Sequence, residues 1–328
     1  MSMFSRPITK RLFPSLVGSS ILVFLISNLC AAQDDYPSQP INVVTHTSPG
    51  GGTDTTARSV VAGTKLALDI DMAVVPKPGA AGVVAMHYIN NQARDGYTVL
   101  AITPSHLFAI ARNLGPLNIE DLVGVVRATD DPNVIMVRAD SAASTLEELF
   151  ELGRNRSIKW GTTQIGGADH IAAATLAQVA GTKISVVPFS GGGEIVTNLM
   201  GGNIDAAGLN LTEALAQIER GDFRALAVMA NERLTVINDV PTTVELGYDV
   251  VYSTVRGYAV LKGTPQDRIQ TLEQGMLQGM RHPIYQSYLR GAGLSRDAIA
   301  GQEVWDAQIN RLYQDARQAM INLGIIEQ

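Results

Sequence analysis

The sequence VVTHTSPGGGTD occupies residues 43–54, and a similar segment, VVPFSGGGE, returns at residues 186–194. Each opens with β-branched residues typical of a strand, passes through a serine and three glycines, and precedes a stretch with helical periodicity. Glycine permits a sharp turn and exposes backbone N–H groups, and the following helix adds unpaired N–H groups and the positive end of its dipole. The repeat therefore predicts two anion-binding loops that hold one acidic ligand between two lobes.

Apolar runs of strand length alternate with helical stretches along the chain, which indicates an α/β fold with doubly wound mixed sheets whose strands are mostly parallel. Strands are expected at residues 41–46, 72–77, 98–102, 133–137, 159–162, 184–187, 206–209, 225–228 and 255–261. Helices are expected at residues 55–67, 146–153, 169–180, 212–220, 265–280, 283–291 and 302–322, with a further helix that ends near residue 91.

The order of these elements predicts two lobes. Lobe 1 is expected to begin with residues 33–133, lobe 2 to cover residues 134–254, and residues 255–328 to return to lobe 1. Two crossings between lobes, near residues 133–137 and 253–258, form a hinge. Both glycine loops follow the carboxyl ends of strands, where ligands of open α/β sheets bind.

The N-terminal segment, residues 1–32, is predicted to be a secretory signal peptide. Three basic residues precede an apolar run at residues 16–29, and Ala32 ends a small-residue cleavage site. The apolar run is too short and too rich in serine for a membrane span. A lipid anchor on Cys30 is not expected, because the bulky Leu29 stands where a lipoprotein signal has a small residue.

Cleavage there changes the formal net charge from −6 to −9 and removes the only cysteine. A chain without cysteine has no disulfide, no thiol nucleophile and no thiolate metal site. The acidic balance argues against a nucleic-acid partner. We therefore expect an exported protein, periplasmic and monomeric, whose stability comes from packing alone.

Motifs for catalysis, metals and cofactors are missing from the sequence. Neither glycine loop reads as a phosphate-binding P-loop, and Thr55 stands where the dinucleotide fingerprint requires glycine or alanine. The five histidines form no metal-binding pair, and no Gly-x-Ser-x-Gly elbow occurs. We therefore expect no metal, no cofactor and no catalysis. An exported enzyme acting on a carboxylated or phosphorylated metabolite in the same cleft stays open, as does an adhesion or signalling module.

Several single residues allow two interpretations. Asp54 would repel an anion, so its expected role is to cap the helix. His106 follows a predicted strand and His170 stands at the start of a predicted helix, and each either lines the pocket or packs in the ordinary way. Arg256 lies in an apolar strand, where its partner is either an internal acid or a second acidic group of the ligand.

A set of short motifs resembles a known family, and these motifs occur in the family's order along nearly the whole chain. They are YPSQPI (36–41), PGGGTD (49–54), KPG (77–79), DGY (95–97), PFSGGG (188–193), GGNID (201–205), RALAV (224–228), DVPT (239–242) and KGTP (262–265). The chain resembles the extracytoplasmic solute receptors of tripartite tricarboxylate transporters, the Bug family.

The resemblance implies a two-lobed Venus-flytrap fold that closes on a carboxylate and delivers it to a large and a small membrane subunit. It also implies that amides of both glycine loops hold one ligand carboxylate with bridging waters, and that the strand end at Asn210 faces the pocket. Many relatives have Asn-Arg-Pro-Gly where this chain has PKPG at residues 76–79, so no side-chain role is transferred there. The predicted ligand is a small organic carboxylate with two or three acidic groups. The predicted ligand-binding residues are Ser48, Gly50, Gly51, Gly52, Thr53, Asp54, Ser105, His106, Thr163, Asp169, Ser190, Gly191, Gly192, Gly193, Asn210 and Arg256.

Overall fold

The computed structural model describes residues 35–163, 168–189 and 191–327. The predicted signal peptide lies outside the described residues. Residues 37–328 form one compact unit, and residues 1–36 belong to another. No helix of the described residues is long and apolar enough to cross a membrane.

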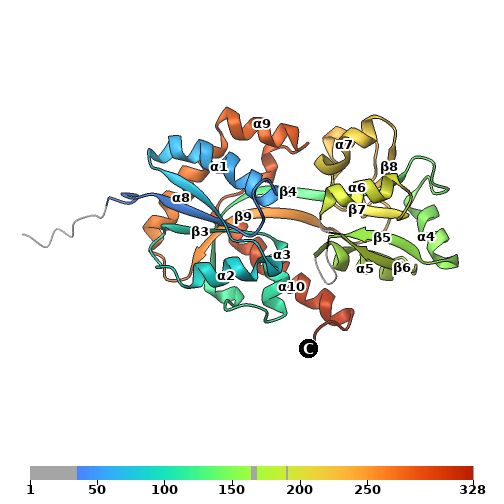
Figure 1. The fold of residues 1–328 in the computed structure, drawn as a ribbon, viewed down its shortest axis with the longest axis horizontal. Helices are drawn as coiled ribbons and strands as arrows, with labels where there is room; N and C mark the ends of the chain where they lie inside the picture. The colour runs from blue at the N-terminus through green and yellow to red at the C-terminus, as the bar shows by residue number, and fades with distance from the viewer. Residues whose placement is uncertain (1–34, 164–167, 190, 328) are drawn as a thin grey trace, which may run out of the picture. The chain divides into compact units, whose positions relative to one another are not determined.

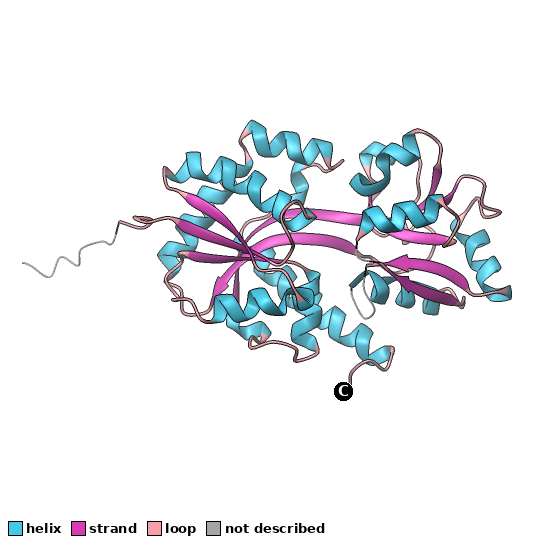
Figure 2. Ribbon diagram, viewed as in Figure 1, coloured by secondary structure: helices cyan, strands magenta, loops and turns pink. Residues whose placement is uncertain are grey.

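A single nine-stranded sheet organises the unit, in the order β2-β1-β3-β9-β4-β7-β5-β6, with β8 beside β4 (Figures 1 and 2). The strands are β1 (Ile41–Thr45), β2 (Met72–Pro76), β3 (Thr98–Ile102), β4 (Leu122–Arg138), β5 (Ile158–Thr162), β6 (Ile184–Pro188), β7 (Ala206–Asn210), β8 (Phe223–Val228) and β9 (Ser253–Leu261). Strands β1, β2 and β3 are parallel, as are β5, β6 and β7, whereas β9 and β4 run antiparallel to their neighbours. The predicted α/β class with a mixed sheet is confirmed.

Strands β4 and β9 connect the two halves of this sheet. β4 pairs with β9 from Leu122–Leu261 to Pro132–Ser253, and its last residues then pair with β7 and β8. The strand predicted at residues 133–137 therefore begins at Leu122, well before the expected position. The polar run that ends at Pro132 resembles a turn locally, but β9 supplies the pairing that keeps it extended.

Helices lie on both sides of the sheet (Figure 2). They are α1 (Gly52–Leu68), α2 (Val83–Asn90), α3 (Pro104–Ala111), α4 (Leu146–Asn155), α5 (Ala168–Val179), α6 (Gly192–Met200), α7 (Leu211–Glu219), α8 (Gln266–Met280), α9 (Pro283–Gly291) and α10 (Gln302–Asn322). Proline occupies the first turn of α3 and α9, where its missing N–H has no helical partner to lose.

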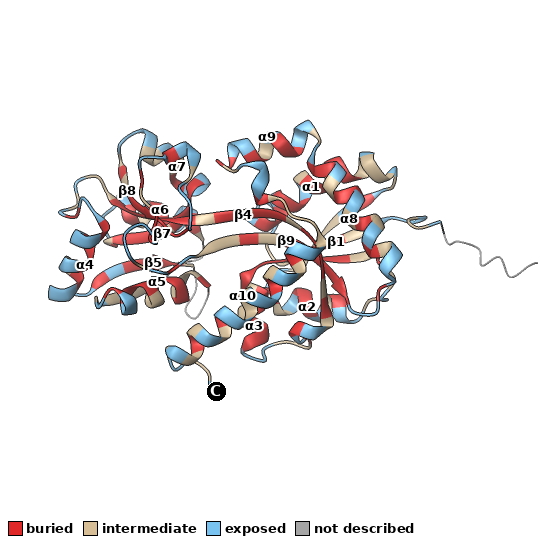
Figure 3. Ribbon diagram, turned by 180° about the vertical axis from the view of Figure 1, so that it is seen from behind, coloured by how far each residue is buried: buried red, intermediate tan, exposed pale blue. Residues whose placement is uncertain are grey.

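Alternate residues of β4 build two different cores in the second half of the sheet. Val134 and Met136 belong to an apolar cluster on one face, and Ile135 and Val137 belong to another on the opposite face. Figure 3 shows the strands mostly buried and the outward faces of the helices exposed. The first glycine loop follows the mostly buried strand β1, whereas the second follows β6, an edge strand whose residues are half-buried or exposed.

Two close approaches in the first half of the sheet require glycine. A Cβ atom at Gly63 of α1 would overlap the backbone carbonyl of Gly279 in α8, so these helices pack nearly backbone to backbone. A Cβ atom at Gly257 of β9 would overlap the indole of Trp305, whose Nε1 donates to the Tyr258 carbonyl at 3.0 Å. The second contact fixes α10 against the strand that carries Arg256.

Candidate functional site

The first glycine loop is braced by its own side chains. Gly50, in the left-handed region at φ +84°, donates its N–H to Asp54 Oδ2 at 2.9 Å, and the Asp54 N–H donates to Thr47 Oγ1 at 3.2 Å. Arg58 holds the same carboxylate through Nε at 2.8 Å and Nη2 at 3.1 Å. Burial opposes ionisation of Asp54, but the bonds from Arg58 and Gly50 outweigh it and lower its pKa. Asp54 thus stabilises the conformation of the loop through these hydrogen bonds.

The open N–H groups of this loop lie at the start of α1. Gly51 donates to the Ser48 carbonyl at 3.0 Å, whereas the N–H groups of Gly52 and Thr53 have no partner among the described residues. A Cβ atom at Gly52 would lie 2.9 Å from Nη2 of Arg256. The arginine guanidinium and the positive end of the helix therefore meet at one point, which favours an anion there.

The second glycine loop meets an internal carboxylate. Gly192 begins α6, and a Cβ atom there would overlap the carboxylate of Glu213. Glu213 Oε2 also accepts the Asn210 N–H at 3.1 Å, as part of the box that caps α7. Burial raises the pKa of Glu213 above its usual value. This side chain already supplies negative charge at the start of α6.

Arg256 and Asp131 form a long ion pair across β9 and β4. Arg256 Nη1 lies 3.8 Å from Asp131 Oδ2, too far for a hydrogen bond. Asp131 is only 3% exposed, and neither its Oδ1 nor Arg256 Nε has a hydrogen-bond partner in the described part of the chain. Burial raises the pKa of Asp131 to about 7; the positive charge of Arg256 opposes this and the negative charge of Glu213 adds to it. Arg256 thus has an internal acid, Asp131, as its partner, but no hydrogen bond joins the two side chains.

Two cavities share the side chains of Asn210, Glu213 and Arg256. The larger has a volume of about 380 Å³ and is lined by Gly52, Thr55, Asp131, Asn210, Thr212, Glu213, Arg256, Ser287, Tyr288, Gly291 and Ala292. The smaller has a volume of about 170 Å³ and is lined by Ser105, Asn133, Thr163, Ala168, Asp169, Gly208, Leu209, Asn210, Glu213, Tyr252, Thr254 and Arg256. We call the two together the central cavity. Residues from both halves of the sheet line the central cavity.

Some predicted residues line this central cavity and others do not. Those that line it are Gly52, Ser105, Thr163, Asp169, Asn210 and Arg256. Asp169 accepts from the Thr163 hydroxyl at 2.9 Å, which joins the start of α5 to the end of β5. Ser48, Gly50, Gly51, Thr53 and Asp54 of the first loop are not among the residues that line it, nor are Gly191, Gly192 and Gly193 of the second. Ser190 is outside the described residues.

His106 is fully buried and does not line the central cavity. Its Nδ1 faces the backbone N–H of Thr103 at 3.2 Å in a capping box, and its ring meets the ring of His46 edge-on at 4.5 Å. Burial lowers the pKa of His46 to about 4 and that of His106 further below its usual value. Both imidazoles are therefore neutral at pH 7 and serve as packing.

Sequence reasoning did not single out Asp131 or Glu213. Asp131 has no local signal, because its role depends on the pairing of β4 with β9. Glu213 has a local signal in the sequence, because the spacing Asn210-x-x-Glu213 is that of a capping box, which places an acid in the first turn of α7. No group of three or more acidic, histidine or cysteine residues of the described chain is arranged to hold a metal ion.

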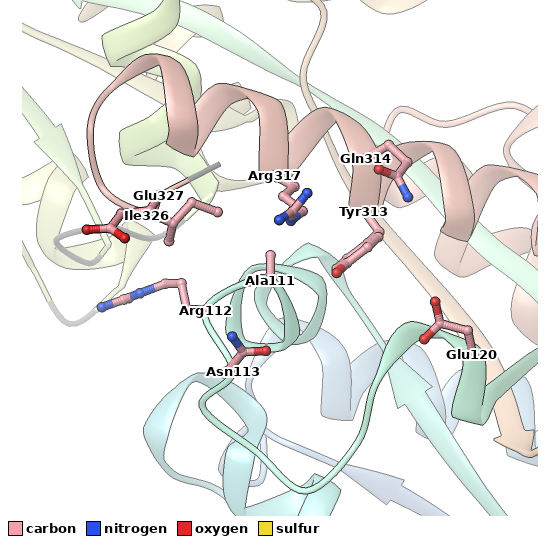
Figure 4. A pocket seen from close by; sticks show the side chains of 9 residues that line it. All are labelled: Ala111, Arg112, Asn113, Glu120, Tyr313, Gln314, Arg317, Ile326 and Glu327. Atoms are coloured by element: carbon pink, nitrogen blue, oxygen red, sulfur yellow. The ribbon is translucent and has the colours of Figure 1, made fainter.

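A third cavity, of about 500 Å³, lies between α3 and α10 (Figure 4). It is lined by Ala111, Arg112, Asn113, Glu120, Tyr313, Gln314, Arg317, Ile326 and Glu327. None of these residues belongs to a glycine loop or to the central cavity. Its arginines provide a control for experiments on Arg256.

The fold and its central cavity define a two-lobed protein of the periplasmic solute-binding type. A TctC solute-binding protein from Polaromonas superposes with a TM-score of 0.78 at 28% identity, over 88% of this chain and 99% of that one. MatC from Rhodopseudomonas palustris, solved with bound malate, superposes with a TM-score of 0.74 at 22% identity, over 87% and 99% of the chains.

The chain belongs to the tripartite tricarboxylate transporter family of receptors, whose pattern it matches over residues 56–323. Protein BugT of Bordetella pertussis is 31% identical over 66% of this chain and 68% of its own length. The resemblance drawn from the sequence motifs is therefore confirmed at the level of the family.

Proposed function

We propose that this protein is an extracytoplasmic receptor that captures a small organic carboxylate in the central cavity and delivers it to the large and small membrane subunits of a tripartite transporter. One observation carries the proposal. The backbone N–H groups of Gly52 and Thr53 have no hydrogen-bond partner among the described residues, and the guanidinium of Arg256 lies next to Gly52. An anion there gains charge-assisted hydrogen bonds from the backbone and from arginine. The malate bound to MatC, a fold relative, supports a carboxylate as the ligand.

The hinge belongs to the same proposal. Only β4 and β9 connect the two halves of the described sheet, and cavity residues come from both halves. Rotation about the segments near Pro132 and Ser253, where these strands change partners, would open and close the cavity. It would also separate Ile171 of α5 from Ala111 and Met320, with which it forms a small buried apolar cluster between the two halves. The lobe boundaries predicted at residues 133 and 254 agree with this proposed hinge.

The test is a thermal-shift screen of mono-, di- and tricarboxylates against the purified chain, followed by calorimetry and analysis of the recovered ligand. A ligand at 100 times its Kd should stabilise the fold by about 2.7 kcal/mol. Arg256→Gln should weaken binding, whereas Arg317→Gln, a matched change in the cavity between α3 and α10, should not. Chemical conversion of the ligand would favour the exported-enzyme alternative and refute the proposal.

A further inference from the structure

The charges that line the central cavity do not match a ligand that is only anionic. Arg256 is the one basic residue among the described residues that line it, whereas Asp131, Asp169 and Glu213 are acidic. Asp169 is bonded to Thr163, and Glu213 is bonded to the Asn210 N–H. A polycarboxylate placed here would meet one guanidinium and three carboxylates.

Glu213 changes the role of the second glycine loop. Its carboxylate lies where a ligand carboxylate would approach the start of α6, since an added Cβ at Gly192 would overlap it. The backbone bond from Asn210 holds the side chain in this position. The two loops of this chain are therefore unequal: α1 offers open N–H groups, and α6 faces an internal acid.

A second observation, independent of Glu213, is that one oxygen of the buried Asp131 carboxylate lacks a hydrogen-bond partner within the described chain. It is 3% exposed, lines the larger part of the central cavity, and its Oδ1 has no hydrogen-bond partner among residues that the structure describes. Arg256, its one charged neighbour of opposite sign, stays 3.8 Å away and forms no hydrogen bond to it. A buried carboxylate oxygen without a donor is unfavourable, and Asp131 lines the cavity, so its carboxylate is suited to meet a positively charged group of a ligand.

We propose that Asp131 and Glu213 form a subsite for a positively charged amine of the solute, beside the carboxylate held by Gly52, Thr53 and Arg256. The inference rests on the proposed function, because it assigns the second end of the same ligand. The solute is then a small amino-carboxylate. Its ammonium interacts with the Asp131 carboxylate and offsets the two acids, while its carboxylate lies at the start of α1.

The experiment compares ligands that differ only in the amine. Succinate is paired with aspartate, glutarate with glutamate, and propionate with alanine, and each is titrated calorimetrically into the chain at pH 8 and low salt. We expect the amine-bearing member of at least one pair to bind at least tenfold more tightly. Asp131→Asn should abolish that preference and leave the amine-free member equally or more tightly bound, because it removes a charge that repels carboxylates. Asp249→Asn, an exposed acid, is the matched control.

The outcomes separate the two proposals. If amine-free acids bind at least as tightly as their partners in every pair, the amine subsite is wrong and the carboxylate receptor stands. If Asp131→Asn weakens both members of a pair equally, the residue is structural and the subsite is also refuted. If no acid of the panel binds, both proposals fail. The comparison in the unaltered chain needs no variant, so poor folding of Asp131→Asn would leave it decisive.

Discussion

Replacing Asp131 with asparagine should make the protein more stable at pH 8 and leave its stability nearly unchanged at pH 4. Burial raises the pKa of this carboxyl from 3.8 to about 7, so the folded chain holds its proton over a range in which the unfolded chain has released it. When the folded state binds more protons, stability falls as pH rises. This loss of stability begins near pH 4, where the unfolded carboxyl ionises, and is complete above pH 7, where the folded carboxyl has also ionised.

The size of the effect follows from the two pKa values. A difference of one pKa unit corresponds to about 1.4 kcal/mol, so full ionisation of Asp131 costs the folded state about 4 kcal/mol as an upper figure. Asparagine keeps the shape and carries no charge. The attraction of Arg256 is already contained in the folded-state pKa, whereas relaxation around the charged carboxylate reduces its cost, so we expect about 1–3 kcal/mol of net stabilisation at pH 8.

Urea unfolding of both proteins between pH 4 and pH 9 measures this difference directly. Subtracting the wild-type curve from the variant curve removes the contribution of groups whose titration does not depend on Asp131; Glu213, which interacts with Asp131, contributes to the difference. Asp249→Asn, a change at an exposed acid, should follow the wild type throughout. A difference curve that is flat between pH 4 and pH 8, or that falls, would refute a buried and poorly compensated carboxylate at this position.

Three further predictions follow from the packing and the site. Gly52→Ala should weaken carboxylate binding by about tenfold, because its Cβ would lie 2.9 Å from Arg256 Nη2, whereas Gly193→Ala, with open space at its Cβ, should bind normally in the same titration. Gly63→Ala should lower the free energy of unfolding by about 1–3 kcal/mol, because the methyl group would overlap the Gly279 carbonyl; denaturation that matches wild type would show that α1 and α8 can separate without loss. Ligand should reduce the radius of gyration in small-angle scattering, and equal radii with and without saturating ligand would contradict closure about β4 and β9.

Much of the fold could be predicted because its local signals agree with its tertiary structure. Prolines and glycines delimit α9, and the alternation of strands and helices was sufficient for β3, α9 and α10 to be predicted within their observed bounds. The apolar run LVGVV at residues 122–126 has the composition of a strand and was missed, but the continuation of β4 through Asp130, Asp131 and Pro132 could not be predicted, because these residues read locally as a turn. Only the pairing with β9, 121 residues further along the chain at the Pro132–Ser253 register, makes that segment a strand.

The site was predictable where it depends on local backbone and not where it depends on distant pairing. The loop before α1 and the lone arginine of β9 were visible in the sequence, and the structure brings Gly52 and Arg256 together. The unequal character of the two loops was not visible. It arises because Glu213, a residue of α7, reaches the start of α6, a contact that no repeat of serine and glycine encodes.

The most direct test of the central claim is a crystal structure of the chain with the tightest-binding acid found by calorimetry. The account predicts a ligand carboxylate within hydrogen-bond distance of the Gly52 and Thr53 N–H groups and of the Arg256 guanidinium, in the central cavity. A ligand bound elsewhere, for example between Arg112 and Arg317 in the cavity beside α10, would contradict it.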